Sequence, residues 1–569
     1  MTIERMRKSA RMMGLAGLAV LAAAALGCGG HGAKEDAGAG VPLSGTVHLA
    51  TGQPPAVAHV ALEEAGGTNP VELAVDAGGR FEVRVAPGDA MALRLAAPDH
   101  EELIVPVCLT SETPASVTVT LAPNPRPETF ENIRIIGDFN GFSFSTAEPM
   151  TPAGDGTWTW ERDGIEGDRF AYQLLGVTTN GHSVNGTMSD TLEYDGGGDF
   201  RSIVTVENGS VRIVFDPSKL PPEPEGAAPA VAWDANHADL GKLFEVVRIR
   251  DEEQAAAAAA WMAHKENGGE DETLEFDRTP WRKKLMAIAG EKPRTLAARV
   301  AFLIAGPEAQ APAGRAWPTK PDPAAAKAIL EMVPVDSPAW GYAPEALQRY
   351  FVLAGTGPDA TKIAERFLEE SPVGAVRIAA LAALTAIARD SGDETAWRER
   401  FAKLKAAVGD SREWRYRLTS LDPDRKIRKG NPVPEFSITR LDGTPFTNEN
   451  LEGHYTLIDF WATWCHPCVG EMPHLHEAWK KYHGKGFQIL SLSLDRSPDD
   501  IARFRKKWPM PWAHAYLEKG FGNPIVKMFE VNGIPTPILV GPDGTIVATA
   551  PATRGEQLMA TLDALYANN

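Results

Sequence analysis

The sequence predicts a multidomain protein built from two N-terminal β-sandwich-type domains, an all-α middle region and a C-terminal α/β domain. Short β-prone segments separated by turn residues fill residues 42–216, and alanine- and leucine-rich helical patterns fill residues 233–425. Strands then alternate with helices across residues 430–569. The length of 569 residues agrees with this division, because domains of roughly 150 residues are common.

The N-terminal segment has the pattern of an export signal. Basic residues precede an apolar run at 12–26, and small residues lead up to Cys28. This pattern predicts a signal peptide over residues 1–27. The sequence Ala-Leu-Gly-Cys at 25–28 resembles a bacterial lipobox. That resemblance implies lipidation of Cys28, a flexible tether over residues 28–41, and a place on the periplasmic face of a bacterial envelope membrane, with the outer membrane favoured. An ordinary signal or an uncleaved anchor is the alternative, although about fifteen apolar residues are short for a transmembrane helix.

Residues 42–124 predict the first β-sandwich. Strand-like segments such as 44–47, 79–85 and 117–121 are separated by turn residues. They resemble carboxypeptidase-regulatory-like sandwiches, and nothing in them has a catalytic pattern. Cys108 lies in an apolar stretch and is expected to be a buried core thiol; the alternative is a reactive or intermolecular thiol.

Residues 128–216 predict a second β domain. The sequence Gly-Asp-Phe-Asn-Gly at 137–141 and the hairpin-spaced tryptophans that follow resemble early-set modules related to glycogen- and starch-binding domains. Sugar binding needs exposed aromatic rings, and the candidates are Phe142, Trp158, Trp160 and Tyr172. Because Trp158 and Trp160 share one strand face, they fit a core equally well. A scaffold is therefore expected, with carbohydrate binding as the less favoured alternative.

A proline-rich linker is expected over residues 217–232, followed by an α-helical domain over residues 233–425. Helical hairpins that resemble a solenoid are plausible there, although no fixed repeat period stands out. The segments with helical patterns are 255–260, 295–305, 323–332, 346–353, 361–369, 375–388 and 394–407.

Residues 430–569 predict a small α/β domain. An apolar strand at 455–460 precedes an amphipathic helix that begins near Pro467, and a second strand is expected at 486–494. A helix follows at 501–508. The segments on either side of Pro542-Asp543-Gly544 form a predicted β-hairpin, and a last helix carries leucines at helical spacing.

Two cysteines three residues apart, Cys465 and Cys468, lie where the first of these strands meets its helix. The helix N-terminus favours the thiolate of Cys465, so this residue is expected to attack a disulfide and Cys468 to resolve the mixed disulfide. A structural zinc site would need two more ligands. The other cysteines, Cys28 and Cys108, stand alone, so no metal is expected.

The C-terminal domain resembles the thioredoxin fold, and within it the TlpA/ResA-like membrane-tethered thiol-disulfide oxidoreductases. The matching motifs are Phe-Trp-Ala-Thr-Trp-Cys-His-Pro-Cys at 460–468, Glu-Met-Pro at 471–473 and Gly-Ile-Pro-Thr at 533–536. The resemblance implies a protein-disulfide reductase that needs no cofactor beyond its own disulfide. It also implies protein thiol or disulfide clients and an electron-exchanging redox partner.

The same resemblance assigns roles to residues around the dithiol. Asp459 matches a buried acid that takes the proton of Cys468, and Glu471 matches an acid near the active site. Pro535 should follow a cis peptide bond and shape the groove for the client. Trp464, His466 and Pro467 complete the set, as motif residues that flank the cysteines.

His466 departs from the family pattern, which usually has an acid directly after the first cysteine. An imidazolium there would favour the Cys465 thiolate, so the direction of electron flow stays open between a reductase and a disulfide oxidase or isomerase. A non-enzymatic lipoprotein scaffold that binds protein or carbohydrate is a further alternative. The net charge of −18 argues against nucleic acid as a partner, because phosphate contacts need basic surface.

Overall fold

The computed structural model describes residues 40–65, 70–221, 224, 226–266, 276–305, 322–355, 357–409, 411, 414–550 and 552–567. The chain divides into two compact units, one ending at Trp414 and the other beginning at Arg415. The expected fold class is confirmed: N-terminal sheets, a helical middle region and a C-terminal thioredoxin-like domain. Cys28 and the signal peptide lie outside the described residues. Within the described ranges, no helix is long and apolar enough to cross a membrane.

The first sandwich consists of two four-stranded sheets, in the orders β16-β7-β1-β4 and β3-β2-β5-β6. Strands β1 and β7 alternate buried and more exposed residues, as strands with one face on a core do. The strand bounds are β1 (Val41–Leu49), β2 (His59–Glu64), β3 (Val71–Glu72), β4 (Arg80–Val85), β5 (Met91–Ala96), β6 (Leu103–Val107), β7 (Ala115–Leu121) and β16 (Ala230–Trp233).

Strand β16 lies where the sequence predicts the end of the linker. It pairs antiparallel with β7, and Ala230 stands opposite Thr120. In the sequence Ala-Val-Ala-Trp of this strand, Val231 and Trp233 are half-buried and the two alanines are exposed. This alternation is typical of a strand. The chain therefore leaves the first sandwich after β7, builds the second sandwich, and returns to the same sheet.

The second sandwich has sheets in the orders β10-β11-β15 and β13-β14-β12-β8-β9. The hydroxyl of Tyr194 donates a 2.7 Å hydrogen bond to Glu102, and its ring stacks on His59, so the two sandwiches touch. Strand bounds are β8 (Arg134–Gly137), β9 (Glu148–Pro149), β10 (Thr151–Pro152), β11 (Trp158–Asp163), β12 (Arg169–Leu175), β13 (Thr191–Tyr194), β14 (Phe200–Thr205) and β15 (Ser210–Phe215).

Most of the aromatic residues suggested for sugar binding pack in or against the hydrophobic core of this domain. Trp160 is 6% exposed and Tyr172 is fully buried, and both belong to the hydrophobic core. Trp158 is half-buried against the same cluster, and the guanidinium of Arg201 covers the ring of Phe142 at 4.3 Å. Trp160 and Tyr172 therefore cannot stack on a sugar, which leaves the scaffold interpretation as the better one.

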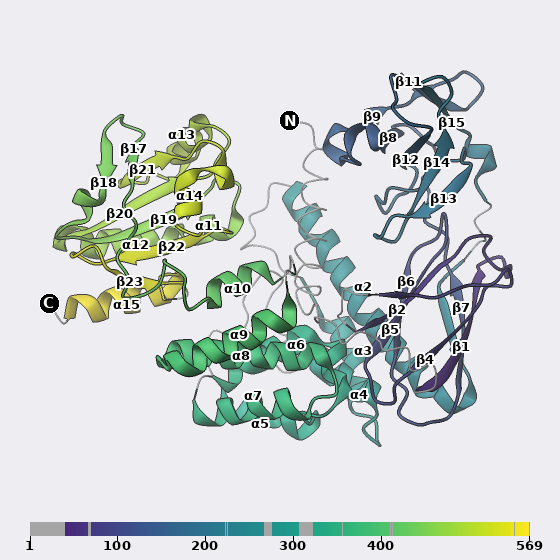
Figure 1. Ribbon diagram of the computed structural model, residues 1–569, viewed down its shortest axis with the longest axis horizontal. Coiled ribbons are helices and arrows are strands. Elements are labelled where there is room, and N and C mark those ends of the chain that lie inside the picture. The colour runs from purple at the N-terminus through teal and green to yellow at the C-terminus, as the bar shows by residue number, and fades with distance from the viewer. Residues whose placement is uncertain are drawn as a thin grey trace. The chain divides into compact units, whose positions relative to one another are not determined.

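The middle region is helical, and consecutive helices pack on one another (Figure 1). Tyr342 joins it to the first sandwich, because its buried hydroxyl lies 2.6 Å from the carbonyl of Val107. Cys108 beside it is buried, as expected, and burial raises its pKa to about 12. The helices are α2 (Ala238–Glu266), α3 (Thr279–Ala289), α4 (Leu296–Ala305), α5 (Pro323–Met332), α6 (Pro344–Ala354), α7 (Pro358–Glu370), α8 (Gly374–Ser391) and α9 (Glu394–Val408).

The C-terminal unit is built on a five-stranded sheet in the order β21-β20-β19-β22-β23. Strands β20 and β21 run parallel to the central β19, whereas β22 is antiparallel to it. The elements are α10 (Arg415–Leu421), β17 (Ser437–Thr439), β18 (Pro445–Thr447), β19 (Tyr455–Trp461), α11 (His466–Gly470), α12 (Met472–Tyr482), β20 (Phe487–Ser493), α13 (Pro498–Lys507), β21 (Ala513–Tyr516), α14 (Pro524–Met528), β22 (Thr536–Val540), β23 (Ile546–Thr549) and α15 (Gly555–Ala567).

Each face of this sheet has its own hydrophobic core. Residues of α14 and of the β17–β18 hairpin pack on one face, and residues of α11, α12, α13 and α15 pack on the other (Figure 1). The predicted strands, the C-terminal hairpin and the last helix are all present. The sequence did not indicate β18, β21 or α14, which are short.

Candidate active site

The central strand β19 carries one acidic residue, Asp459, into the core. Side chains of a strand alternate between the two faces of the sheet. Ile458 and Phe460 belong to the core on one face, and Leu457 and Trp461 to the core on the other. Asp459 therefore faces the same side as Leu457 and Trp461. That side also holds both cysteines, so the buried acid and the dithiol share one core.

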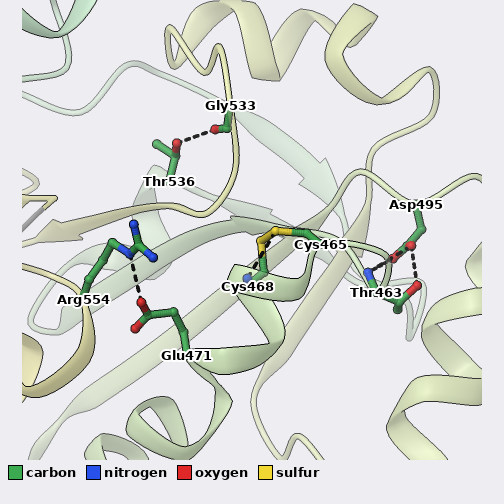
Figure 2. The surroundings of a disulfide bond; sticks show 8 residues. All are labelled: Thr463, Cys465, Cys468, Glu471, Asp495, Gly533, Thr536 and Arg554. Carbon is green, nitrogen blue, oxygen red and sulfur yellow. Dashed lines mark hydrogen bonds and ion pairs between the residues drawn. A yellow bond between two sulfur atoms is a disulfide. The ribbon is translucent and has the colours of Figure 1, made fainter. Parts of the chain in front are cut away.

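Cys465 and Cys468 form a disulfide bond with their Cα atoms 5.2 Å apart (Figure 2). Cys465 is the N-cap of α11, and its sulfur accepts a 3.2 Å hydrogen bond from the backbone N–H of Cys468. Such a bond favours the thiolate once the disulfide is reduced. Pro467 lies in the first turn of α11, where its missing N–H costs no hydrogen bond. Trp464 is 43% exposed beside the pair.

Asp459 is 4% exposed, and burial is the main reason that its pKa rises from 3.8 to about 7. The negative charge of Glu471 raises the pKa of Asp459 further, and the positive charge of Arg554 lowers it. A carboxyl group with this pKa exchanges its proton near neutral pH. It can therefore act as a base for a thiol close by.

Glu471 lies between α11 and α12, and each of its carboxylate oxygens accepts a hydrogen bond. One carboxylate oxygen accepts a 2.9 Å bond from Nε of Arg554 (Figure 2). The other accepts a 2.7 Å bond from the backbone N–H of Gly555. Both donors lie at the start of α15, where a carboxylate also meets the positive end of the helix dipole. The sequence indicated Glu471 but not its partner Arg554.

A second acid, Asp495, supports the loop before the dithiol from its other side (Figure 2). Its carboxylate is buried and accepts bonds from the backbone N–H of Thr463 at 3.1 Å and from the Thr463 hydroxyl at 2.7 Å. The Ser493 hydroxyl donates a third bond, at 2.7 Å. Asp495 could not be predicted as a site residue from the sequence, because a single acid after a strand is typical of many turns.

We expect Asp495→Ala to loosen the loop that carries Cys465. Three donors would lose a charged acceptor, which should cost about 2–4 kcal/mol locally. Hydrogen exchange followed by mass spectrometry should then show faster exchange at residues 463–465. Asp499→Ala is the matched control, because Asp499 is an exposed acid on α13. Unchanged exchange at residues 463–465 would contradict the bracing role of Asp495.

Pro535 follows a cis peptide bond after Ile534, as the family resemblance implies. The turn that it forms is tied by the Thr536 hydroxyl, which donates a 2.6 Å bond to the carbonyl of Gly533. Ile534 packs partly against both cores of the unit. The turn leads directly into β22, the neighbour of β19.

The structure thus brings Cys465, Cys468, Asp459 and Glu471 into one region. His466 is part of α11, but its side chain lies outside the described part of the structure. Within the described residues, no three His, Cys, Asp or Glu side chains are grouped so as to hold a metal ion. The arrangement provides a disulfide, a buried carboxyl group with a raised pKa and an acid paired with arginine.

Comparison with known proteins identifies relatives of the C-terminal unit. The model of a family described as thioredoxin-like matches residues 453–546. A thiol-disulfide oxidoreductase ResA of Bacillus cereus is 33% identical over 122 residues, which are 21% of this chain and 69% of that protein. ResA of Bacillus thuringiensis subsp. konkukian is 31% identical over 140 residues, which are 25% of this chain and 78% of that protein. A solved thioredoxin domain of a thiol-disulfide oxidoreductase from Bacteroides vulgatus is 29% identical, covering 24% of this chain and 97% of that one with a TM-score of 0.23.

Proposed function

Because this chain belongs to the ResA-like thiol-disulfide oxidoreductases, we propose that it reduces disulfide bonds of protein clients in the bacterial cell envelope. The observation that carries the proposal is the disulfide of Cys465 and Cys468 in one core with the buried base Asp459. A redox partner must return the disulfide to the dithiol form after each cycle. No metal or organic cofactor is required.

The reaction begins when the Cys465 thiolate attacks one sulfur of a client disulfide. The client S–S bond breaks, a mixed disulfide forms, and the other client sulfur leaves as a thiolate that takes up a proton. Cys468 then gives its proton to Asp459 and attacks the sulfur of Cys465. The mixed disulfide breaks, the second client sulfur leaves as a thiolate that takes up a proton, and the Cys465–Cys468 disulfide forms. Two electrons pass from this chain to the client. The two protons that the client takes up balance the one that Cys465 lost on forming its thiolate and the one that Asp459 takes from Cys468 and then releases.

The surroundings of the sulfur atoms favour the reducing direction. Dithiols of this fold become strong oxidants when their reduced form is stabilised. Both cysteines lie in an apolar core, and burial disfavours a thiolate. Among the described residues, a single N–H, that of Cys468, donates to the sulfur of Cys465. This modest stabilisation supports a reductase rather than a disulfide oxidase or isomerase.

The midpoint potential of the Cys465–Cys468 couple tests the direction. The full chain is equilibrated in redox buffers of known potential, and the two cysteines are followed by alkylation and mass spectrometry. We expect a value near the thioredoxin end of the range for this fold, about −270 mV. A value near −120 mV would make the protein an oxidase or isomerase, and the absence of a reversible couple would favour a scaffold. His466→Gln in parallel measures the contribution of the imidazole.

The proposed location rests on the N-terminal sequence. Basic residues, an apolar run and Cys28 together resemble the signal of a lipoprotein. We place the protein on the periplasmic face of an envelope membrane, attached through lipid on Cys28, with the outer membrane favoured. The full chain should be found in the membrane fraction, and Cys28→Ser should release it. A Cys28→Ser chain that stays in the membrane fraction would argue against the lipid anchor.

A further inference from the structure

The residues just before α15 link the two acids of the active site. The Thr553 hydroxyl is buried and donates a 3.0 Å bond to the carbonyl of Pro537. Pro537 stands opposite Asp459 in the antiparallel pairing of β22 with β19. The next residue, Arg554, binds Glu471 at 2.9 Å, and Gly555 binds the other oxygen of Glu471. One short segment is thus fixed beside the strand position of Asp459 while it holds Glu471.

This geometry gives Glu471 a cationic partner on the α15 side. Both of its oxygens accept hydrogen bonds from donors on the α15 side. One of these donors is the guanidinium of Arg554 (Figure 2). Charge-assisted pairs of this kind are among the stronger hydrogen bonds. Glu471 without its partner would place an uncompensated negative charge near the buried Asp459.

We propose that Arg554 is a positioning residue for the proton transfer, which neutralises Glu471 and so keeps the carboxylate of Asp459 able to take the proton of Cys468. The inference rests on the proposed exchange reaction and adds to it the residue that sets its pH dependence. The proton leaves the Cys468 thiol for the Asp459 carboxylate, and the resulting thiolate then displaces the client from Cys465.

The charges around Asp459 determine in which direction its pKa changes when Glu471 or Arg554 is removed. Glu471 raises the pKa of Asp459, and Arg554 lowers it. On α12, the side chain of His474 also lies close to this segment, because a Cβ on Gly555 would lie 4.0 Å from its Nε2. Removing Arg554 should move the pH midpoint of Asp459 upward, and removing Glu471 should move it downward. Removing both charges should return it close to the wild-type value.

The test uses the full chain as wild type, Arg554→Gln, Glu471→Gln and the double variant. The reduced chain is mixed rapidly with oxidised glutathione, which forms a mixed disulfide with Cys465, and the release of the second glutathione is measured in a single turnover across pH. We expect the midpoint of the rate profile to shift by about one pH unit in opposite directions in the two single variants. Arg554→Lys should restore most of the wild-type profile, and His474→Gln should leave the midpoint unchanged.

A second measurement separates this inference from the proposed function. Infrared difference spectra follow the protonated carboxyl band of Asp459, assigned by its loss in Asp459→Asn, without any turnover. Opposite shifts of the pH midpoint of this band in Arg554→Gln and Glu471→Gln support the role of Arg554 even if no exchange with a disulfide is found. Exchange that proceeds with one common midpoint in wild type and both single variants would overturn the role of Arg554. Shifts in the same direction in both variants would overturn it as well, because a purely structural disturbance has no reason to follow charge.

Discussion

Cys465→Ser should abolish disulfide exchange, whereas Cys468→Ser should stop the reaction at a mixed disulfide. The sulfur of Cys465 accepts the N–H bond at the start of α11, so this residue supplies the attacking thiolate. A serine hydroxyl is not ionised at neutral pH, and we expect the exchange rate to fall roughly a thousandfold or more. Without Cys468, the first attack still occurs, but no thiol remains to release the client.

The measurement combines a disulfide substrate assay with trapping. The full chain is mixed with a protein disulfide, quenched in acid and separated without reducing agent. Cys468→Ser should give a covalent adduct through Cys465, and the double variant should give none. Cys108→Ala is the control and should behave like wild type, because Cys108 is buried in the upstream unit. An adduct of equal yield through Cys468 in Cys465→Ser would reverse the assigned roles.

Asp459→Asn should slow the release of the client and also stabilise the C-terminal unit. As the base for Cys468, Asp459 should contribute roughly a hundredfold to the rate of the second step. The rate of that step in wild type should rise as the pH passes through about 7, the pKa of Asp459, and the variant should lose this rise. An amide of the same shape cannot take the proton.

The effect on stability follows from the sign of the same shift. The pKa of Asp459 is raised from 3.8 to about 7, so the folded state binds more protons than the unfolded state between these values. Stability therefore falls as the pH rises through this window, and the loss is complete above pH 7. The shift corresponds to at most about 4 kcal/mol. Asp459→Asn removes this penalty at pH 8 and has little effect near pH 4.

Hydrogen exchange at the amides of β19 reports this free energy without treating the whole chain as two-state. The oxidised wild type and Asp459→Asn are compared at pH 5 and pH 8, with rates corrected for the intrinsic effect of pH. Glu477→Gln is the matched control, because it removes an exposed acid of α12 in the same unit. Equal protection of β19 in wild type and Asp459→Asn at pH 8 would contradict a buried, destabilising carboxylate.

Local patterns in the sequence were enough to indicate the dithiol, its strand and its helix. The cis bond before Pro535 and the burial of Asp459 were also expected, although only from the family resemblance. Arg554 and Asp495 could not be predicted in this way. Arg554 meets Glu471 across 83 residues, and Asp495 meets Thr463 across 32, so both contacts depend on how the strands and helices assemble.

In the upstream unit, helices α4 to α9 agreed well with the predicted segments, because helical patterns are long and local. Helix α3 was not predicted, and only residues 255–260 of α2 were. Helix α5 begins and ends where its pattern does. Strand β16 was not predicted, because an alternation of four residues is too short to indicate a strand directly after a proline-rich segment. For Trp160, periodicity alone could not separate a core residue from a sugar platform. The partners that bury it, such as Phe139 and Phe170, come from other elements.

The return of the chain through β16 makes the second sandwich an insertion. Its entrance at the end of β7 and its exit into β16 lie on neighbouring antiparallel strands, where Thr120 faces Ala230 and the backbones are about 5 Å apart. Strands in that arrangement can be joined by a two-residue turn. Evolution could therefore exchange, enlarge or delete this module as a cassette without moving the strands that hold it. The same junction offers protein engineers a place to graft a binding domain onto a redox protein.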